Sequence, residues 1–322
     1  MEPILHRAAA EHGLTVKQLR SRSFAHPVNG VATAASATDL RTRTLAALRV
    51  MPRDAVATHV TAAALRGWAL PRGLDVPVIV CTDGNAPHLD RRGVYVRRCA
   101  IPPRHRTSLD GVTIASAEWT VVELAETLSL LDLVTVIDSA LAAGDTTLPH
   151  LREALVPGRR GVRTLRRALL YSDGRSESAG ESALRLVHTL SGIDVDSQVE
   201  LRDRDGTLVL RLDLRVRGTS YAPEFDGADH RDPRTHRRDL RRERSLHGWG
   251  IQRAGWTFVE ICRQPEEIVR MASEALGRPG AFNAADARAA VSASSLTADG
   301  MRALERRMAR FVRSSPPRSR RS

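Results

Sequence analysis

The stretch LVLRLDLRVRGTSYAPEFDGADH, from Leu208 to His230, decides the fold of the C-terminal part of this chain. In its first half, aliphatic residues recur at every second position and alternate mostly with polar ones, which is the period of a β-strand that buries one face. Residues 218–220, Gly-Thr-Ser, predict a turn, and a second strand follows it. This pattern places Asp213 on the polar face of the first strand and Glu224 and Asp226 on a common face of the second.

These acidic residues and the nearby His230 can gather at one edge of the predicted sheet. Mg²⁺ binds through one or two carboxylates and keeps several waters. A site that cleaves phosphodiesters needs such a cation to neutralise the phosphate and to activate or orient a water. Acidic residues on an arginine-rich strand are more commonly part of a solvated face with salt bridges that contribute little. The spacing alone leaves both interpretations open.

A wider set of motifs surrounds this stretch. They are ESALRL from Glu181, RLDL around Asp213, EFDGADHR from Glu224, RRDLRRERSL from Arg237 and GWTFVEI from Gly255. With them, residues 178–260 resemble the very-short-patch-repair (Vsr)-like endonuclease domains of the PD-(D/E)XK nuclease superfamily, and more closely an actinobacterial domain family of unknown function. The resemblance implies a metal, Mg²⁺ or Mn²⁺, held by Asp213 and Glu224. It also implies catalytic support from Glu181, Asp226 and His230.

Two features of these motifs qualify the resemblance. The superfamily lysine, two residues after the glutamate, is Asp226 here, and Lys17 is the only lysine of the chain. The closer family also has Asp at this place, so the identity of the water-activating group stays open. Ser178 and Glu181 form a Ser-x-x-Glu capping box, in which Glu181 would close back on the Ser178 amide. Glu181 is therefore predicted as a cap, a metal-site residue or both.

The charge of the chain predicts a polyanionic partner. The net charge is +12, and all 49 basic residues except Lys17 are arginines. Arginine grips phosphate oxygens in pairs, and a basic surplus favours nucleic acid. Residues 234–247 predict a helix with an unusually dense basic face, so we expect it to follow DNA phosphates through Arg234, Arg237, Arg238, Arg241 and Arg242.

Residues 1–35 predict a small winged helix. Pro3–Ala10 and Val16–Ser21 read as helices, the second capped by Thr15, and residues 27–30 read as a turn before a strand. The frame LT-x-x-x-L followed by GV resembles the N-terminal winged helix-turn-helix of AbiEi-type antitoxins. It implies DNA contacts by Lys17 and Arg20. A generic helical cap on the next module is the alternative.

The middle of the chain predicts strands at Val78–Cys81 and Val94–Arg98 and then a helical connector over residues 106–175. With no histidine or cysteine near them in sequence, the acidic residues of the connector read as solvated: Glu118, Glu123, Glu126, Asp132 and Asp138. The three cysteines, far apart and without CxxC spacing, argue against a zinc ribbon or a disulfide framework and suit a reducing cytoplasm. The first residues, MEPILHRAAAEHG, lack the basic start and apolar run expected of a secretory signal, and no stretch approaches the ~20 apolar residues that span a bilayer. These observations predict a cytoplasmic protein with no membrane partner.

The sequence thus predicts an α/β protein divided at residues 1–105, 106–175, 176–277 and 278–322. These parts are a winged helix-turn-helix module, a helical connector, a restriction-endonuclease-like mixed sheet flanked by helices, and a helical, basic, partly disordered tail. The predicted function is a metal-dependent DNA endonuclease or nickase. The alternative is a non-cleaving DNA-binding regulator of the toxin–antitoxin kind. A toxin or homo-oligomer partner is left open.

Overall fold

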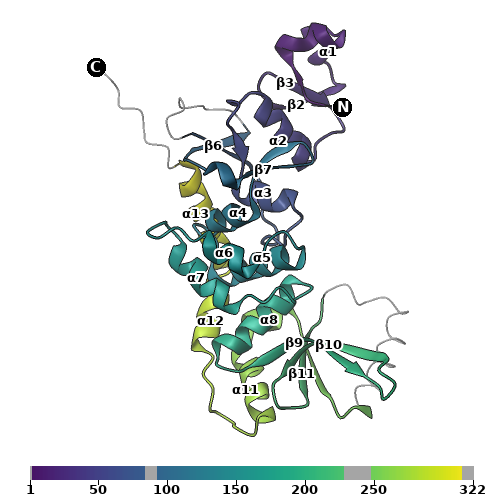
Figure 1. Cartoon of the computed structure of the whole chain (residues 1–322), viewed down its shortest axis with the longest axis vertical. Helices are drawn as coiled ribbons and strands as arrows, with labels where there is room; N and C mark the ends of the chain where they lie inside the picture. Colours follow the sequence, from purple (N-terminus) through teal and green to yellow (C-terminus); the bar gives the residue numbers. More distant parts are fainter. Residues whose placement is uncertain (1, 84–92, 228–247, 314–322) are drawn as a thin grey trace. The chain divides into compact units, whose positions relative to one another are not determined.

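The computed structural model describes residues 2–83, 93–227 and 248–313. It is a mixed α/β protein with several open sheets, which confirms the predicted fold class at that level. The chain folds into two compact units (Figure 1). Unit 1 comprises residues 1–127, 149–162 and 305–322, and unit 2 comprises residues 128–148 and 163–304. None of the described helices combines the length and apolar character that crossing a membrane requires.

Unit 1 begins with a small sheet of order β1-β3-β2, made by β1 (Ile4–Leu5), β2 (Phe24–Val28) and β3 (Val31–Ala34). A 3-10 helix at His6–His12 and α1 (Val16–Leu19) lie between β1 and β2. The predicted helix at Pro3–Ala10 is wrong at its start, because Ile4 and Leu5 pair with β3 instead. Thr15 caps α1 as predicted, in a capping box with Gln18. The winged-helix assignment stays a prediction.

The larger sheet of unit 1 has the order β6-β5-β4-β8-β7. Its strands are β4 (Val56–Ala57), β5 (Val78–Thr82), β6 (Val94–Arg98), β7 (Arg106–Leu109) and β8 (Val112–Ala115). The helices of this part of the chain include α2 (Leu40–Arg49), α3 (His59–Leu65), α4 (Ala117–Leu124) and α6 (Leu148–Glu153). Apolar side chains of α2, β5 and β6 form a buried core. The predicted connector is therefore not purely helical, because β7 and β8 pair with each other at its start.

Unit 2 contains two strand pairs covered by helices. The strands β9 (Val195–Arg202) and β10 (Leu208–Val216) are antiparallel, and β11 (Tyr221–Phe225) and β12 (Gln252–Trp256) are parallel. Helix α8 (Ala179–Leu190) packs against β9, β10 and β11 (Figure 1). The other helices are α5 (Leu130–Ala142), α7 (Val162–Tyr171), α10 (Phe258–Arg263), α11 (Pro265–Ala275), α12 (Ala285–Ser292) and α13 (Ala298–Arg313). The division between the units falls within α6, α7 and α13.

One predicted strand is a helix. The sequence predicts the last strand at Thr257–Ile261, but β12 ends at Trp256 and α10 follows at once. Thr257 and Glu260 form a capping box, whose reciprocal bonds satisfy the exposed amides of the first turn. The Thr-x-x-Glu pattern was present in the sequence, and it outweighs the β-propensity of Phe258, Val259 and Ile261.

Candidate functional site

Glu181 lies in the first turn of α8 and connects it to β9. Ser178 Oγ accepts a hydrogen bond from the backbone N–H of Glu181 at 3.2 Å, as expected for a helix cap. Glu181 Oε2 accepts the amide of Glu177 at 2.9 Å, so the predicted closure on the Ser178 amide is wrong by one residue. The same oxygen accepts a bond from Gln198 Nε2 at 2.7 Å. Gln198 has a φ of 53°, a conformation that non-glycine residues seldom adopt and that often marks functional sites.

A side-chain hydrogen bond of Asp213 connects β10 to β11, two strands that belong to separate sheets. Its Oδ2 accepts the backbone N–H of Phe225 at 3.0 Å. The neighbours Leu212 and Leu214 are fully buried, whereas Asp213 is half-buried, which agrees with the predicted alternation. The carboxylate is thereby held beside the end of β11, where Glu224 and Asp226 lie.

Glu224 and Asp226 are bridged by Arg253 of β12. Arg253 Nε donates to Glu224 Oε2 and its Nη2 donates to Asp226 Oδ1, each at 2.5 Å. The two carboxylates therefore lie on the same side of the strand, as the alternation predicts. Glu224 is only 2% exposed. Burial lowers the pKa of Arg253, but the bonds to Glu224 and Asp226 outweigh it and leave that pKa above its ordinary value.

Two glycines permit the close approach of elements around these carboxylates. A Cβ on Gly180 of α8 would collide with the ring of Phe225, and a Cβ on Gly255 of β12 would collide with the carboxylate of Asp226. Glycine at these positions therefore keeps α8 and β12 close to the end of β11. Sequence reasoning did not assign a role to either glycine or to Arg253.

The donor chemistry of Asp213 and Glu224 suits Mg²⁺ or Mn²⁺, since hard cations prefer carboxylate oxygens and Mg²⁺ needs only one or two of them. Within residues 2–83, 93–227 and 248–313, no three His, Cys, Asp or Glu side chains form a group that could hold a metal ion. A cation at this place would therefore depend on waters or on the substrate for most of its ligands. It would also compete with Arg253 for Glu224.

Several predicted residues fall elsewhere. His230 and the arginines of the predicted basic helix lie outside the described residues: Arg234, Arg237, Arg238, Arg241 and Arg242. Lys17 and Arg20 are exposed in α1 and at its C-terminal cap, which leaves their charges available to a ligand of unit 1.

The acidic residues of the predicted connector are not all solvated, and that prediction is wrong for Glu123, Asp132 and Asp138, which are buried. Asp138 Oδ2 binds Arg185 at 2.5 Å and the hydroxyl of Ser182 at 2.7 Å. The signal that could have revealed Glu123 is its place inside the apolar run of α4, AEWTVVEL.

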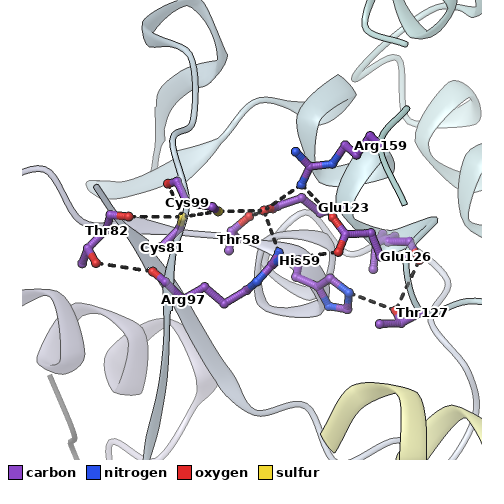
Figure 2. A network of polar contacts seen from close by, with 11 residues as sticks. Thr58, His59, Cys81, Thr82, Arg97, Cys99, Glu123, Glu126, Thr127 and Arg159 are labelled. Atoms are coloured by element: carbon purple, nitrogen blue, oxygen red, sulfur yellow. Dashed lines mark hydrogen bonds and ion pairs between the residues drawn. The ribbon is translucent and has the colours of Figure 1, made fainter. Parts of the chain in front are cut away.

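Glu123 is the centre of a polar network in unit 1 (Figure 2). Its Oε1 lies 3.3 Å from Arg97 Nη1 and 3.9 Å from Arg159 Nη2, and Thr58 donates to its Oε2. Burial, followed by the charge of Cys99, raises the pKa of Glu123 to about 8, although Arg97 and Arg159 oppose the shift. The network is thus a charged cluster that the fold encloses rather than a solvated helix face.

Two proteins of Mycobacterium tuberculosis match this chain, one from strain CDC 1551 / Oshkosh and one from strain ATCC 25618 / H37Rv. Each is 30% identical over 223 residues, which cover 67% of this chain and 78% of the relative. Both are described as uncharacterized. No family model matches the chain, and no solved structure matches it. The chemistry of this chain's own residues therefore has to indicate its function.

Proposed function

The chain belongs to the same family as these two mycobacterial proteins, and we propose from its own residues that it is a metal-dependent DNA endonuclease or nickase. The site is the C-terminal end of β11 in unit 2, together with Asp213 of the neighbouring β10. The observation that carries the proposal is Glu224, a buried carboxylate at the end of a strand, with Asp226 on the same side and Asp213 beside it.

The energetic cost of this arrangement supports a functional role. An ionised carboxylate taken out of water loses several kcal/mol of solvation, which a partner offsets only in part. Glu224 and Glu181 are both buried near β11, and each accepts a side-chain bond, Glu224 from Arg253 of β12 and Glu181 from Gln198 of β9. Such positioning is typical of carboxylates that must keep a fixed geometry for a cation. Beside a DNA phosphate, the same negative charges would be unfavourable without one.

In this proposal the residues have the following roles. Asp213 and Glu224 would hold Mg²⁺ or Mn²⁺, which when bound supplies charge neutralisation and a polarised water. Arg253 keeps Glu224 and Asp226 in place, and its partly exposed guanidinium would also attract a phosphate. Glu181 connects α8 to β9 through its bond with Gln198 and so holds the helix beside the site. His230 is proposed as a general acid or base, on the resemblance to the Vsr-like domains.

The second candidate is a DNA-binding regulator of the toxin–antitoxin kind that does not cleave. It is favoured by Arg253, which already neutralises Glu224 and Asp226, and by the Asp at the place of the superfamily lysine. The net charge of +12 and the exposed Lys17 and Arg20 fit either candidate, because both need to bind DNA.

Incubation of the purified chain with supercoiled plasmid in Mg²⁺, Mn²⁺ or EDTA tests the proposal. We expect nicking with a metal and none in EDTA. Asp213→Asn should abolish nicking while the protein stays folded, and DNA binding in EDTA should persist or tighten because a negative charge has gone. Asp205→Asn, in the exposed turn between β9 and β10, is the matched control and should nick like the wild type. Tight DNA binding without nicking in either metal would instead support the regulator.

A further inference from the structure

Two cysteines that are distant in sequence face each other in unit 1. Cys81 lies in β5, and Cys99 follows the last residue of β6. The strands β5 and β6 are parallel, and Cys81 pairs with Arg97. Cys99 lies two residues after Arg97, so its side chain is on the same side of the sheet as that of Cys81. Their Sγ atoms lie 2.8 Å apart, and Cys81 Sγ also donates to the carbonyl oxygen of Cys99 at 2.9 Å. Both are free thiols.

The two thiols have different surroundings (Figure 2). The hydrogen bond between the two thiols lowers the pKa of Cys99, and the charges of Arg97 and Arg159 lower it further although burial opposes them. The same bond and burial raise the pKa of Cys81. A thiolate is the reactive form of cysteine, and neighbouring cations favour it. Cys81 is 1% exposed, but Cys99 is partly exposed. The thiol that ionises more readily thus also belongs to the more exposed residue.

We propose that Cys99 is an oxidation site for small hydroperoxides and that Cys81 is its resolving partner, so that the two close to a disulfide. In the first step, the Cys99 thiolate attacks the terminal hydroperoxide oxygen and the O–O bond breaks, so that hydroxide leaves from hydrogen peroxide and alkoxide from an alkyl hydroperoxide. The sulfur is oxidised by two electrons to a sulfenic acid, and the peroxide is reduced. In the second step, Cys81 sulfur attacks Cys99 sulfur, the S–O bond breaks, and water leaves with the thiol proton of Cys81.

The geometry favours the second step. A disulfide bond is about 2.0 Å long, so the Sγ atoms need to approach by less than ~1 Å from their present separation. Cys262 in unit 2 provides a comparison, because burial raises its pKa and its Sγ contacts the Leu296 carbonyl at 3.6 Å. The proposal therefore assigns selective oxidation to the Cys81–Cys99 pair. It is independent of the proposed nuclease activity, because all of its residues belong to unit 1.

The test treats the full chain with one equivalent of hydrogen peroxide near neutral pH, then alkylates the remaining thiols and maps them by mass spectrometry. We expect the loss of two hydrogens, a Cys81–Cys99 cross-linked peptide, alkylation of Cys262 alone, and full reversal by dithiothreitol. Oxidation of Cys262 at the same rate, or a cross-link that does not join Cys81 to Cys99, would overturn the proposal.

Variants separate attack from resolution. Cys81→Ser should leave a Cys99 sulfenic acid that dimedone traps, whereas Cys99→Ser should leave Cys81 unmodified, and Cys262→Ser should behave like the wild type. Equal dimedone labelling of Cys81 and Cys99 in the two single variants would contradict the division of roles. Arg159→Gln should slow the oxidation of Cys99 up to about tenfold, the change in thiolate fraction for one pKa unit. An unchanged rate in a folded Arg159→Gln protein would exclude that arginine from activating the thiol.

Discussion

Replacing Arg253 with glutamine tests whether the bridge to Glu224 and Asp226 is structurally important. Removal of one partner of a fully buried ion pair costs about 3–5 kcal/mol, because the other charge stays buried. Glu224 is 2% exposed, but the Arg253 side chain is 29% exposed, so water screens part of this loss. Asp226 is 39% exposed, and its pair with Arg253 contributes less than about 1 kcal/mol. We therefore expect Arg253→Gln to lower the free energy of unfolding by about 2–3 kcal/mol.

Urea denaturation followed by circular dichroism measures this change, and Arg202→Gln is its matched control. Arg202 Nη2 binds Glu200 Oε2 at the same distance of 2.5 Å, but both side chains are largely exposed, at 51% and 44%. The control should change stability by less than about 0.5 kcal/mol. The double variant Glu224→Gln/Arg253→Gln should recover more than about 1 kcal/mol of the loss, since no charge then stays buried.

Two results would refute this reasoning. One is an equal, small effect of Arg253→Gln and Arg202→Gln, which would show that burial of Glu224 does not strengthen the pair. The other is additivity of Glu224→Gln and Arg253→Gln, which would show that the two side chains do not interact in solution. If Glu224 also binds a metal, Mg²⁺ should raise the melting temperature of Arg253→Gln more than that of the wild type, because the cation then has no competitor.

Three further changes have expected outcomes. Burial lowers the pKa of His188 to about 4, so the wild type should lose about 2 kcal/mol of stability between pH 7 and 4.5 as the unfolded chain binds the proton. His188→Leu should remove that loss in urea titrations at the two pH values, and an unchanged pH slope would contradict it. Burial raises the pKa of Glu123 to about 8. The folded state therefore holds the extra proton and stability should fall by up to about 4 kcal/mol as the pH rises from 4.5 to 8, a slope that Glu123→Gln should flatten in the same assay. Gly180→Ala should cost about 1–3 kcal/mol through its collision with Phe225, whereas Gly248→Ala, with open space around it, should cost far less. Equal effects of the two glycine variants would show that the contact with Phe225 is not tight.

Local patterns were enough to predict many elements. The bounds of β6 agree with the sequence prediction, and the strand predicted from the alternation after Leu208 is β10, because strand propensity and alternation act over a few residues. The strand predicted at residues 257–261 is wrong for a local reason too, because the capping box of Thr257 and Glu260 starts a helix there. The short strands β7 and β8 were missed because each gains its stability from the other. Strand pairing is a non-local contact that a single segment does not report.

By itself, the sequence determined the alternation that places Asp213 opposite the buried leucines, the capping of α8 by Ser178, and the basic surplus of the whole chain. Only the tertiary structure decided which charges are buried and what offsets them. Arg253 reaches Glu224 from 29 residues away, Arg97 reaches Glu123 from 26 residues away, and Cys99 meets Cys81 across 18 residues. The free energy of a charge depends on its burial and on its nearest partners, and both are set by packing between segments that are separate in the sequence.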